Sequence, residues 1–479
     1  MIPRRVPPVV VMAGCAFVLF GCDFAPAYHA PVTAIPARFK EAGPWQPAQP
    51  ADTAPRGPWW EAYGDAELNS LESQVNAGNQ TLAAAVAAYD QARAYAQEAE
   101  AGLFPTIGLG GAISTNRQSN ARPLRSAGQP SYYGANTLDA QANFELDIWG
   151  RVRDFVAAGK AEAQASSADL AAVRLSLHAE LADDYVTLRG LDAEIALLNN
   201  TVDAYGKALT LVHNRFQGDI ASGVDVAQAE TQLNSAKSQV SDVTARRQLL
   251  EHAIATLIGQ PAPAFSLAES AEPIAQPDIP TGVPSTLLQR RPDIAAAERQ
   301  VASANQMVGV AKAAFYPALS LNLLGGFQRT SMNLLSLPMS FWSIGPGLTM
   351  PLFEGGLRHA ELSGAKAAFR EAGARYRATV LGAFQDVEDK LALLHWLAQA
   401  AKDEDAAVAA AERSVSLALN LYRDGAENYL QVVTAQTAEL DAERAALDLR
   451  TRRLQASVGL IRALGGGWTT GDLPPENQL

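Results

Sequence analysis

The sequence predicts a mixed α+β membrane protein in which long helices greatly outnumber a few strands. Three observations lead to this class. Apolar residues recur every three or four positions over long stretches, which is typical of packed helices. Two pairs of segments alternate polar and apolar residues, and each segment has about ten residues, enough to cross a bilayer as a tilted strand. The same order of elements also occurs twice along the chain.

Residues 1–21 are predicted to be a signal peptide, and residues 22–65 the N-terminal segment that follows it. Two arginines precede an apolar run from Val6 to Phe20, which is short for a transmembrane helix of roughly 20 residues. The run ends in Leu-Phe-Gly-Cys, which resembles a bacterial lipobox, so we expect Cys22 to carry lipid after cleavage. The alternative is an ordinary signal peptide that happens to contain cysteines.

Four segments are predicted as strands: Thr106–Thr115, Thr137–Trp149, Ala318–Arg329 and Phe341–Phe353. The alternation is strictest from Leu138 to Asp147, where every second residue is apolar. We expect the apolar side chains of this stretch to face lipid. The polar ones should then face a water-filled lumen: Asp139, Gln141, Asn143, Glu145 and Asp147.

Aromatic residues recur where helix is expected to become strand: Phe104, Trp149, Tyr316 and Phe353. In a membrane barrel such residues form a girdle at the water–lipid interface. The alternative is that they pack in a soluble core. Their recurrence at equivalent points of both halves favours the girdle.

The helical stretches carry heptad stripes of the coiled-coil kind. From Leu188 to Phe216 the apolar residues follow steps of three and four, and a second stripe runs from Leu233 to Leu257. Two glycines separate the stripes, which predicts a helical hairpin. If Arg153–Arg215 is one helix, it is on the order of 95 Å long. A helix of that length requires an elongated bundle or tube.

The repeated order of elements indicates a structural duplication. AGLFPTIGLGG from Ala101 is matched by AAFYPALSLNL from Ala313. Each half ends in two helices joined by a turn that contains glycine. The first repeat is predicted to span 66–260, with strands in 106–149 and a tip turn at 216–223. A proline-rich connector covers 261–292, followed by a second repeat at 293–464, its strands in 318–353, its tip turn at 423–429, and a tail at 465–479.

Four strands cannot close a barrel, since single-chain membrane barrels begin at about eight strands. We therefore expect copies of the chain to associate. Three copies would supply about twelve strands, although the pattern does not fix the number of copies.

The run from Leu287 to Leu321 resembles the signature of the outer membrane factors, which are TolC-like channels. The likeness is to the lipoprotein branch found in tripartite drug-efflux systems with RND-type pumps. WWEAYGDAELNSL, FELDIWGRVR and PLFEGGLR are also similar, and the similarity is collinear from Cys22 to about Gly467. The resemblance implies a homotrimer with a transmembrane β-barrel, a long periplasmic α-helical barrel and an equatorial belt that includes the connector.

The same resemblance implies a function and its partners. The protein would be a passive exit duct for drugs and small toxic compounds, docked to a periplasmic adaptor (a membrane fusion protein) and an inner-membrane RND-type pump. It would be anchored in the bacterial outer membrane by lipid on Cys22 and extend into the periplasm, without enzymatic activity or cofactor. Asp23 follows the expected lipidated cysteine. In enteric bacteria, an aspartate at this position favours retention in the inner membrane, which is a small point against the outer-membrane location.

In this family, residues just after each tip turn narrow the periplasmic end of the channel. The matching residues are Asp225 in the first repeat and Leu430, Gln431 and Thr434 in the second. Several relatives carry aspartates where this chain has Gln431 and Thr434, so a strongly anionic gate is not expected here. Leu430 is the best gate candidate, because three leucines would narrow and dewet the pore. The alternative is that these residues only pack or cap their helices.

Other function classes receive little support. The formal net charge of −12 gives no reason to expect a nucleic-acid partner. The histidines show no metal-ligand spacing, and a Ser-x-x-Lys match at Ser363 lacks its partner motifs, so no catalytic or metal site is predicted. Rival functions are a lipid-anchored periplasmic coiled-coil adaptor, and a TolC-like duct for protein secretion or metal efflux.

Overall fold

The computed structural model describes residues 24–36, 38–42, 58–119, 121, 128, 130–277, 279, 287–331 and 335–479. Cys22 and the predicted signal peptide lie outside the described residues. The helices and strands follow in the order α2 (Ala66–Gly78), α3 (Gln80–Ala101), β1 (Thr106–Arg117), β2 (Tyr132–Glu145), α4 (Arg151–Gln217), α5 (Gly223–Leu257), α6 (Leu287–Arg290), α7 (Pro292–Ala313), β3 (Ala318–Arg329), β4 (Ser340–Thr349), α8 (Leu357–Arg423) and α9 (Tyr429–Ala463).

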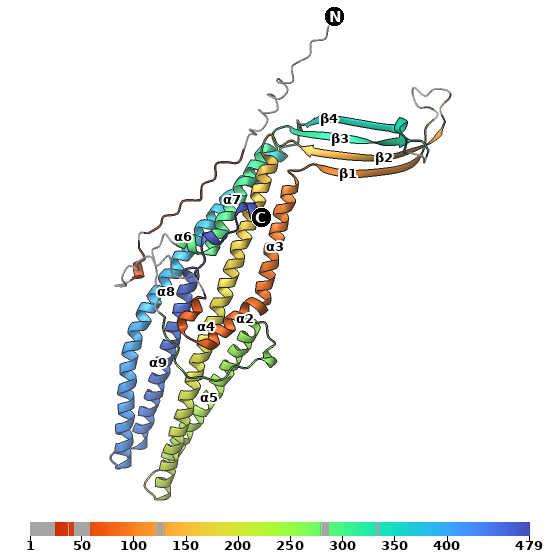
Figure 1. Cartoon of the computed structure of the whole chain (residues 1–479). Coiled ribbons are helices and arrows are strands. Elements are labelled where there is room, and N and C mark those ends of the chain that lie inside the picture. The colour runs from red at the N-terminus through yellow and green to blue at the C-terminus, as the bar shows by residue number, and fades with distance from the viewer. Residues whose placement is uncertain are drawn as a thin grey trace.

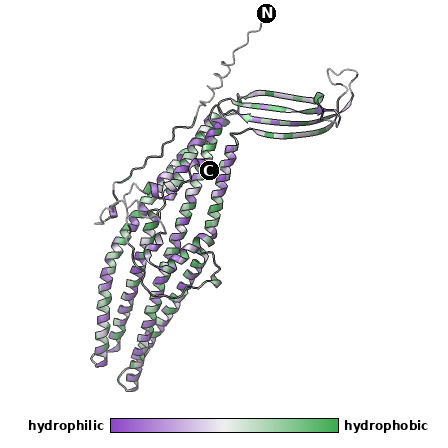
Figure 2. Ribbon diagram, in the orientation of Figure 1, coloured by the Kyte–Doolittle hydropathy of each residue, from purple (hydrophilic) through white to green (hydrophobic). Residues whose placement is uncertain are grey.

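The molecule is a long helical body with a sheet at one end (Figure 1). The sheet projects sideways from the body, and the turns of the two helical hairpins, α4–α5 and α8–α9, lie at the opposite end. Figure 2 shows polar and apolar residues mixed along the helices rather than separated into blocks. None of the helices in the described part of the chain is both long and apolar enough to cross a membrane.

The long helices of the two halves match in length and order. Helices α4 and α8 each have 67 residues, about 100 Å at the usual rise per residue, and α5 and α9 each have 35. The long helices begin after Gly150 and Gly356, which have φ angles of 78° and 92°. Because this left-handed conformation favours glycine, each Gly-to-helix junction is set by the local sequence.

All four strands belong to one antiparallel sheet in the order β1-β2-β3-β4. The two predicted pairs are present, and β2 also pairs with β3, which joins the two repeats. The predicted start of the second strand is wrong, because β2 begins at Tyr132 rather than Thr137. Two predicted strand ends are also wrong. β2 ends at Glu145 rather than Trp149, because the chain turns through Ile148, whose N–H donates to Leu146 O at 2.8 Å. β4 ends at Thr349 rather than Phe353, just before Pro351.

The core is divided into several clusters along the helical body. The largest one joins α2 to the middle of α4 and to the end of α5 around Leu68, Leu181 and Ile254. Heptad residues of α4 such as Leu198 and Val212 are buried in smaller clusters toward the tips. α4 also packs closely on α9, since a Cβ atom at Gly190 would lie 2.3 Å from Thr451 Oγ1.

Candidate functional site

At the tip of the first hairpin, Ser222 and Asp225 cap the N-terminus of α5. Ser222 Oγ accepts from the N–H of Asp225 at 3.3 Å, and Asp225 Oδ2 accepts from the N–H of Ser222 at 3.0 Å. This reciprocal pair satisfies two of the otherwise unbonded N–H groups at the start of a helix. Asp225, a predicted gate residue, therefore has a capping role in the single chain.

The second tip carries the other three predicted gate residues on the first turn of α9. Asn428 Oδ1 accepts from the N–H of Gln431 at 3.3 Å, which starts the helix. Leu430 is 50% exposed, and Thr434, one turn later, is also exposed and donates its hydroxyl to Leu430 O at 2.9 Å. Leu430 and Thr434 thus share one outward face of α9, and the Leu430 side chain lies outside the buried cluster of the tips.

A residue that the sequence did not single out connects the two tips. Arg215, near the end of α4, donates from Nη1 to Tyr422 O at 2.8 Å and to Arg423 O at 3.2 Å. Its guanidinium also lies 4.7 Å from the centre of the Tyr422 ring. These carbonyl groups end α8 and have no partner within that helix, so a cation is favoured there. A cationic residue beside the turn was the only sequence signal for this contact.

Apolar packing supports the same connection between the tips. Tyr422 and Tyr429 pack edge to face, with ring centres 5.3 Å apart. They share a cluster with Val212 and Ala229 of the first hairpin. Gln232 of α5 adds a hydrogen bond to Val433 O of α9 at 3.3 Å. The two hairpins are therefore held together at the end of the molecule that carries the predicted gate residues.

The strand register gives the sheet two chemically different faces. Directly paired residues of antiparallel strands point to the same face, so Leu109, Ala140 and Gly325 share one face, and Gly110, Asp139 and Gly326 share the other. The first face is largely apolar, with polar Thr115, Arg117, Asn136, Arg329 and Ser340 at the end away from the helices. Its apolar residues are Ile107, Leu109, Ile113, Leu138, Ala140, Ala142, Phe144, Leu319, Leu321, Leu323, Phe327, Trp342, Ile344 and Leu348. Its β1 and β4 residues are largely exposed in the single chain.

The opposite face is polar and includes four of the five residues predicted to line a lumen. It carries Thr106, Ser114, Asn116, Asp139, Gln141, Asn143, Glu145, Ser320, Asn322, Gln328 and Ser343, with Leu324 and Phe341 as large apolar exceptions. The alternation seen in one segment thus extends across the whole sheet, because the register aligns the polar positions of all four strands.

The assignment of Asp147 to a strand is wrong. β2 ends two residues earlier, and the Asp147 carboxylate accepts from the N–H groups of Val152 at 3.2 Å and Arg153 at 2.9 Å. A carboxylate at a helix N-terminus satisfies N–H groups that have no partner within the helix. Glu145, the last residue of β2, pairs with Arg151 at 2.6 Å. Both acids therefore hold the start of α4.

Two of the four predicted interfacial aromatics come together at the junction of sheet and helices. The rings of Trp149 and Tyr316 stack 4.9 Å apart, and Trp149 Nε1 donates to Pro317 O at 2.8 Å. Phe24 completes the stack against Tyr316 at 4.5 Å. Phe104 and Phe353 stay outside it, with exposures of 68% and 91%.

The N-terminal segment continues from Phe24 along α7. Three polar residues of this helix lie seven positions apart, and each contacts the segment: Lys312 Nζ donates to Phe24 O at 3.1 Å, Asn305 Nδ2 donates to Pro26 O at 2.7 Å, and the Tyr28 hydroxyl donates to Glu298. Seven residues are about two helical turns, so these contacts form one stripe. The stripe fixes Phe24 at the base of the sheet.

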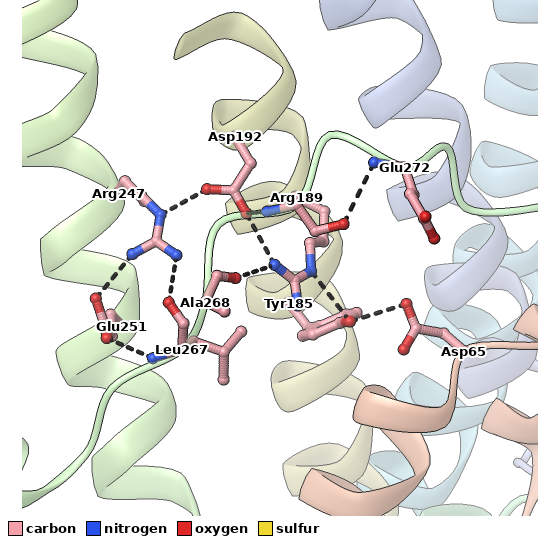
Figure 3. Close-up of polar contacts among 10 residues, drawn as sticks. Asp65, Tyr185, Arg189, Asp192, Arg247, Glu251, Leu267, Ala268 and Glu272 are labelled. Carbon is pink, nitrogen blue, oxygen red and sulfur yellow. Dashed lines mark hydrogen bonds and ion pairs between the residues drawn. The ribbon is translucent and has the colours of Figure 1, made fainter. Parts of the chain in front are cut away.

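A buried charge network attaches the connector to the middle of the helical body (Figure 3). Asp192 of α4 accepts from Arg247 of α5 at 2.5 Å and from Arg189 at 2.9 Å. Arg247 donates to Leu267 O and Arg189 to Ala268 O, both at 2.7 Å. The arginines therefore bond to the connector through its backbone. Tyr185 extends the network to Asp65 at 2.8 Å.

A second buried pair fixes α2 to α4. Glu72 and His178 are both buried, with Oε2 and Nδ1 2.6 Å apart, and Trp60 stacks on the imidazole ring. Burial raises the pKa of Glu72 to about 9. Burial and the nearby Arg174 lower the pKa of His178 to about 4. Both groups are therefore neutral near pH 7, and the carboxyl group donates its proton to the imidazole.

Long helical hairpins joined to a sheet with one polar and one apolar face define a TolC-like outer membrane factor. The model of the family described as outer membrane efflux protein matches residues 71–260 and 283–466. The chain belongs to this family, which confirms the resemblance, and it acts as an outer-membrane component of efflux rather than in the rival role of an adaptor.

Two curated relatives are similar over nearly the whole chain. The pyoverdine export outer membrane protein OpmQ of Pseudomonas aeruginosa is 31% identical over 465 residues, covering 95% of this chain and 96% of OpmQ. The antibiotic efflux pump outer membrane protein ArpC of Pseudomonas putida is 31% identical over 462 residues, covering 95% of each. The solved structure of the outer-membrane channel OprN is 29% identical, with a TM-score of 0.84, covering 93% of this chain and 100% of that one. These likenesses confirm the mixed α+β class.

Proposed function

We propose that three copies of the chain form a channel in which each supplies one four-stranded sheet to a barrel of about twelve strands. The observation that carries this proposal is the sheet with an apolar face and a polar face. An apolar outer face suits lipid and a polar inner face suits a water-filled lumen. Among the residues that the structure describes, β1 and β4 each have a strand partner on one side and none on the other, so each can pair with a neighbouring copy.

The helical hairpins of the three copies would continue the barrel into the periplasm. Their tips would dock to a periplasmic adaptor, and through it to an inner-membrane RND-type pump that supplies the transport energy. The chain itself is a passive duct for drugs and small toxic compounds. The curated relatives are named for pyoverdine export and antibiotic efflux, which supports small molecules rather than secreted proteins or metal ions as cargo.

The periplasmic end would be closed by the second-repeat tips. Leu430 is half-exposed on the first turn of α9, beside the exposed Gln431 and Thr434. Three copies of this leucine would form an apolar ring that excludes water and ions. Opening would require α8 and α9 to move away from the first hairpin, with loss of the Arg215 contacts. An adaptor that binds the separated tips more tightly would shift the population toward the open channel.

Lipid on Cys22 would anchor each chain to the outer membrane. Support comes from Phe24, which follows Cys22 by two residues and stacks at the junction of sheet and helices. This places the start of the described segment beside Trp149 and Tyr316, where an interfacial aromatic girdle is expected. Two residues span at most about 7 Å, so the attached acyl chains could enter the bilayer beside the sheet.

Planar-bilayer recording with the purified, detergent-solubilised protein tests the proposed channel. We expect stable unitary conductance steps and an SDS-resistant species with three times the mass of one chain. A monomeric protein without conductance would contradict the proposal. Replacement of Cys22 by serine separates the anchor from the barrel, because the protein should still need detergent for extraction when lipid is absent.

A further inference from the structure

Arg247 and Arg453 occupy equivalent positions in the two structural repeats. Each is the 25th residue of a 35-residue helix, Arg247 in α5 and Arg453 in α9. Arg247 is fully engaged, because its guanidinium donates to Asp192, Glu251 and Leu267 O (Figure 3). The first repeat therefore supplies two carboxylates to this arginine, and the connector supplies a carbonyl.

The second repeat lacks the two carboxylates. The α8 residue equivalent to Asp192 is Ala398, and the α9 residue equivalent to Glu251 is Ser457. Among the residues that the structure describes, the buried Nε atom of Arg453 has no hydrogen-bond partner. A buried donor without an acceptor costs free energy, so Arg453 would be stabilised by an anion that comes from outside the described chain.

A cavity of about 380 Å³ lies beside Arg453. It is bounded by three elements: the middle of α4, connector residues 271–276, and α9. Its apolar wall includes Val186, Ile274 and Leu454. Pockets of roughly 300–1,000 Å³ with an apolar lining and a few polar groups are typical small-molecule sites.

Of the arginines that line the cavity, Arg453 is the one with a buried donor that lacks a hydrogen-bond partner among the described residues. Arg189 is bound by Asp192 and by Ala268 O. Arg450 pairs with Asp405 at 3.4 Å on the surface. Glu272 also lines the cavity, but it is exposed to solvent, so its repulsion of an anion is screened.

We propose that this cavity binds a small amphipathic carboxylate. The carboxylate pairs with the guanidinium of Arg453, and the apolar body packs against Val186, Ile274 and Leu454. Arginine suits this ligand because its planar guanidinium matches a carboxylate with two parallel hydrogen bonds. A space bounded by three elements of one chain fits a small molecule rather than a folded protein segment.

Fluorine NMR of trifluoromethyl benzoate, titrated into the full-length protein in detergent, tests the site. Trifluoromethyl benzamide is the neutral control of nearly the same shape. We expect the benzoate to bind at least tenfold more tightly than the benzamide. Equal binding of the two probes, or no saturable binding of the benzoate, would overturn the proposal.

Benzoate binding to matched variants tests whether the probe binds in this cavity. Arg453→Gln should weaken benzoate binding at least tenfold, whereas Arg452→Gln should leave it unchanged, because Arg452 is exposed and pairs with Asp448 at 3.4 Å. Glu272→Gln should strengthen binding by removing a like charge. If Arg453→Gln fails to fold, Ala193→Leu offers a second test, since it fills the cavity without removing the arginine.

Two results would assign Arg453 a different role. Unchanged benzoate binding in the Arg453→Gln protein would show that the probe binds elsewhere. Absence of binding together with loss of the SDS-resistant oligomer in Arg453→Gln would show that the arginine pairs with a neighbouring chain. Channel conductance is measured separately, so failure of this site leaves the proposed channel testable on its own.

Discussion

Arg215 donates a hydrogen bond to the carbonyl oxygen of Tyr422 at 2.8 Å and lies over the ring of the same residue at 4.7 Å. One side chain of the first hairpin thus holds both the backbone and the side chain of the second. The contact lies at the tip, a few residues from Leu430, so it connects the two parts that must separate if the channel opens there.

Substitution of Arg215 by glutamine should favour the open channel. Glutamine cannot supply the charge at the end of α8, so the two tips are held less strongly. We expect higher mean conductance in a planar bilayer than for the unmodified protein. Arg246→Gln is the control, because Arg246 is exposed and pairs with Asp242 at 3.2 Å on its own helix. Equal conductance of the two variants would exclude Arg215 as a contact that limits opening.

Truncation of Leu430 to alanine should also raise conductance. A ring of alanines is wider and easier to wet than a ring of leucines, which lowers the barrier to ions. Leu417→Ala provides the comparison, since Leu417 is a similarly exposed leucine of α8 outside the first turn of α9. A conductance equal to that of the unmodified channel would mean that Leu430 only packs at the tip.

The two faces of the sheet can be distinguished by thiol labelling. Asn143→Cys lies on the polar face and Phe144→Cys on the apolar one. In outer-membrane vesicles, a charged thiol reagent should modify the first much faster than the second, because the reagent enters water and not lipid. Equal rates at both positions would show that the sheet does not separate lipid from a lumen.

Loss of the Asp192 carboxylate should strongly destabilise the middle of the body. Asp192→Ala leaves Arg247, which is 5% exposed, without its main counter-charge. Removal of one member of a buried ion pair typically costs about 3–5 kcal/mol. We expect a clearly lower thermal unfolding temperature in detergent. Asp242→Asn, which removes an exposed ion pair, should cost no more than about 1 kcal/mol.

Stability should depend on pH through Glu72. Its pKa is about 9 in the folded protein and 4.5 ordinarily, so the folded state keeps a proton that the unfolded chain releases. Its contribution to the free energy of unfolding is fully present below pH 4.5 and is lost as pH rises toward 9.

Glu72→Gln removes that titration while keeping a neutral group of the same shape. The unfolding midpoint of the variant in urea should therefore rise relative to the unmodified protein between about pH 6 and about pH 9. His178 is present in both proteins and its folded pKa is about 4, so it does not produce this difference. Parallel pH curves would show that Glu72 is ionised in the folded state.

Much of the fold could be predicted because apolar residues recur at regular short intervals along the sequence. The heptad steps from Leu188 to Phe216 predicted a helix that the structure extends to 67 residues. The alternation from Leu138 predicted a two-faced strand, and the register extends those faces over all four strands. Both patterns repeat within a few residues, so neighbouring side chains alone reveal them.

The tertiary structure decided which residues meet where the chain turns and where distant helices pack against each other. Asp147 continues the strand pattern in the sequence, yet it caps α4, because the turn at Ile148 brings the helix N–H groups to its carboxylate. Arg215 and Tyr422 are separated by 207 positions, and Asp192 and Arg247 by 55. No local pattern encodes such pairs, since they form only when packing of the hairpins sets which helix faces meet.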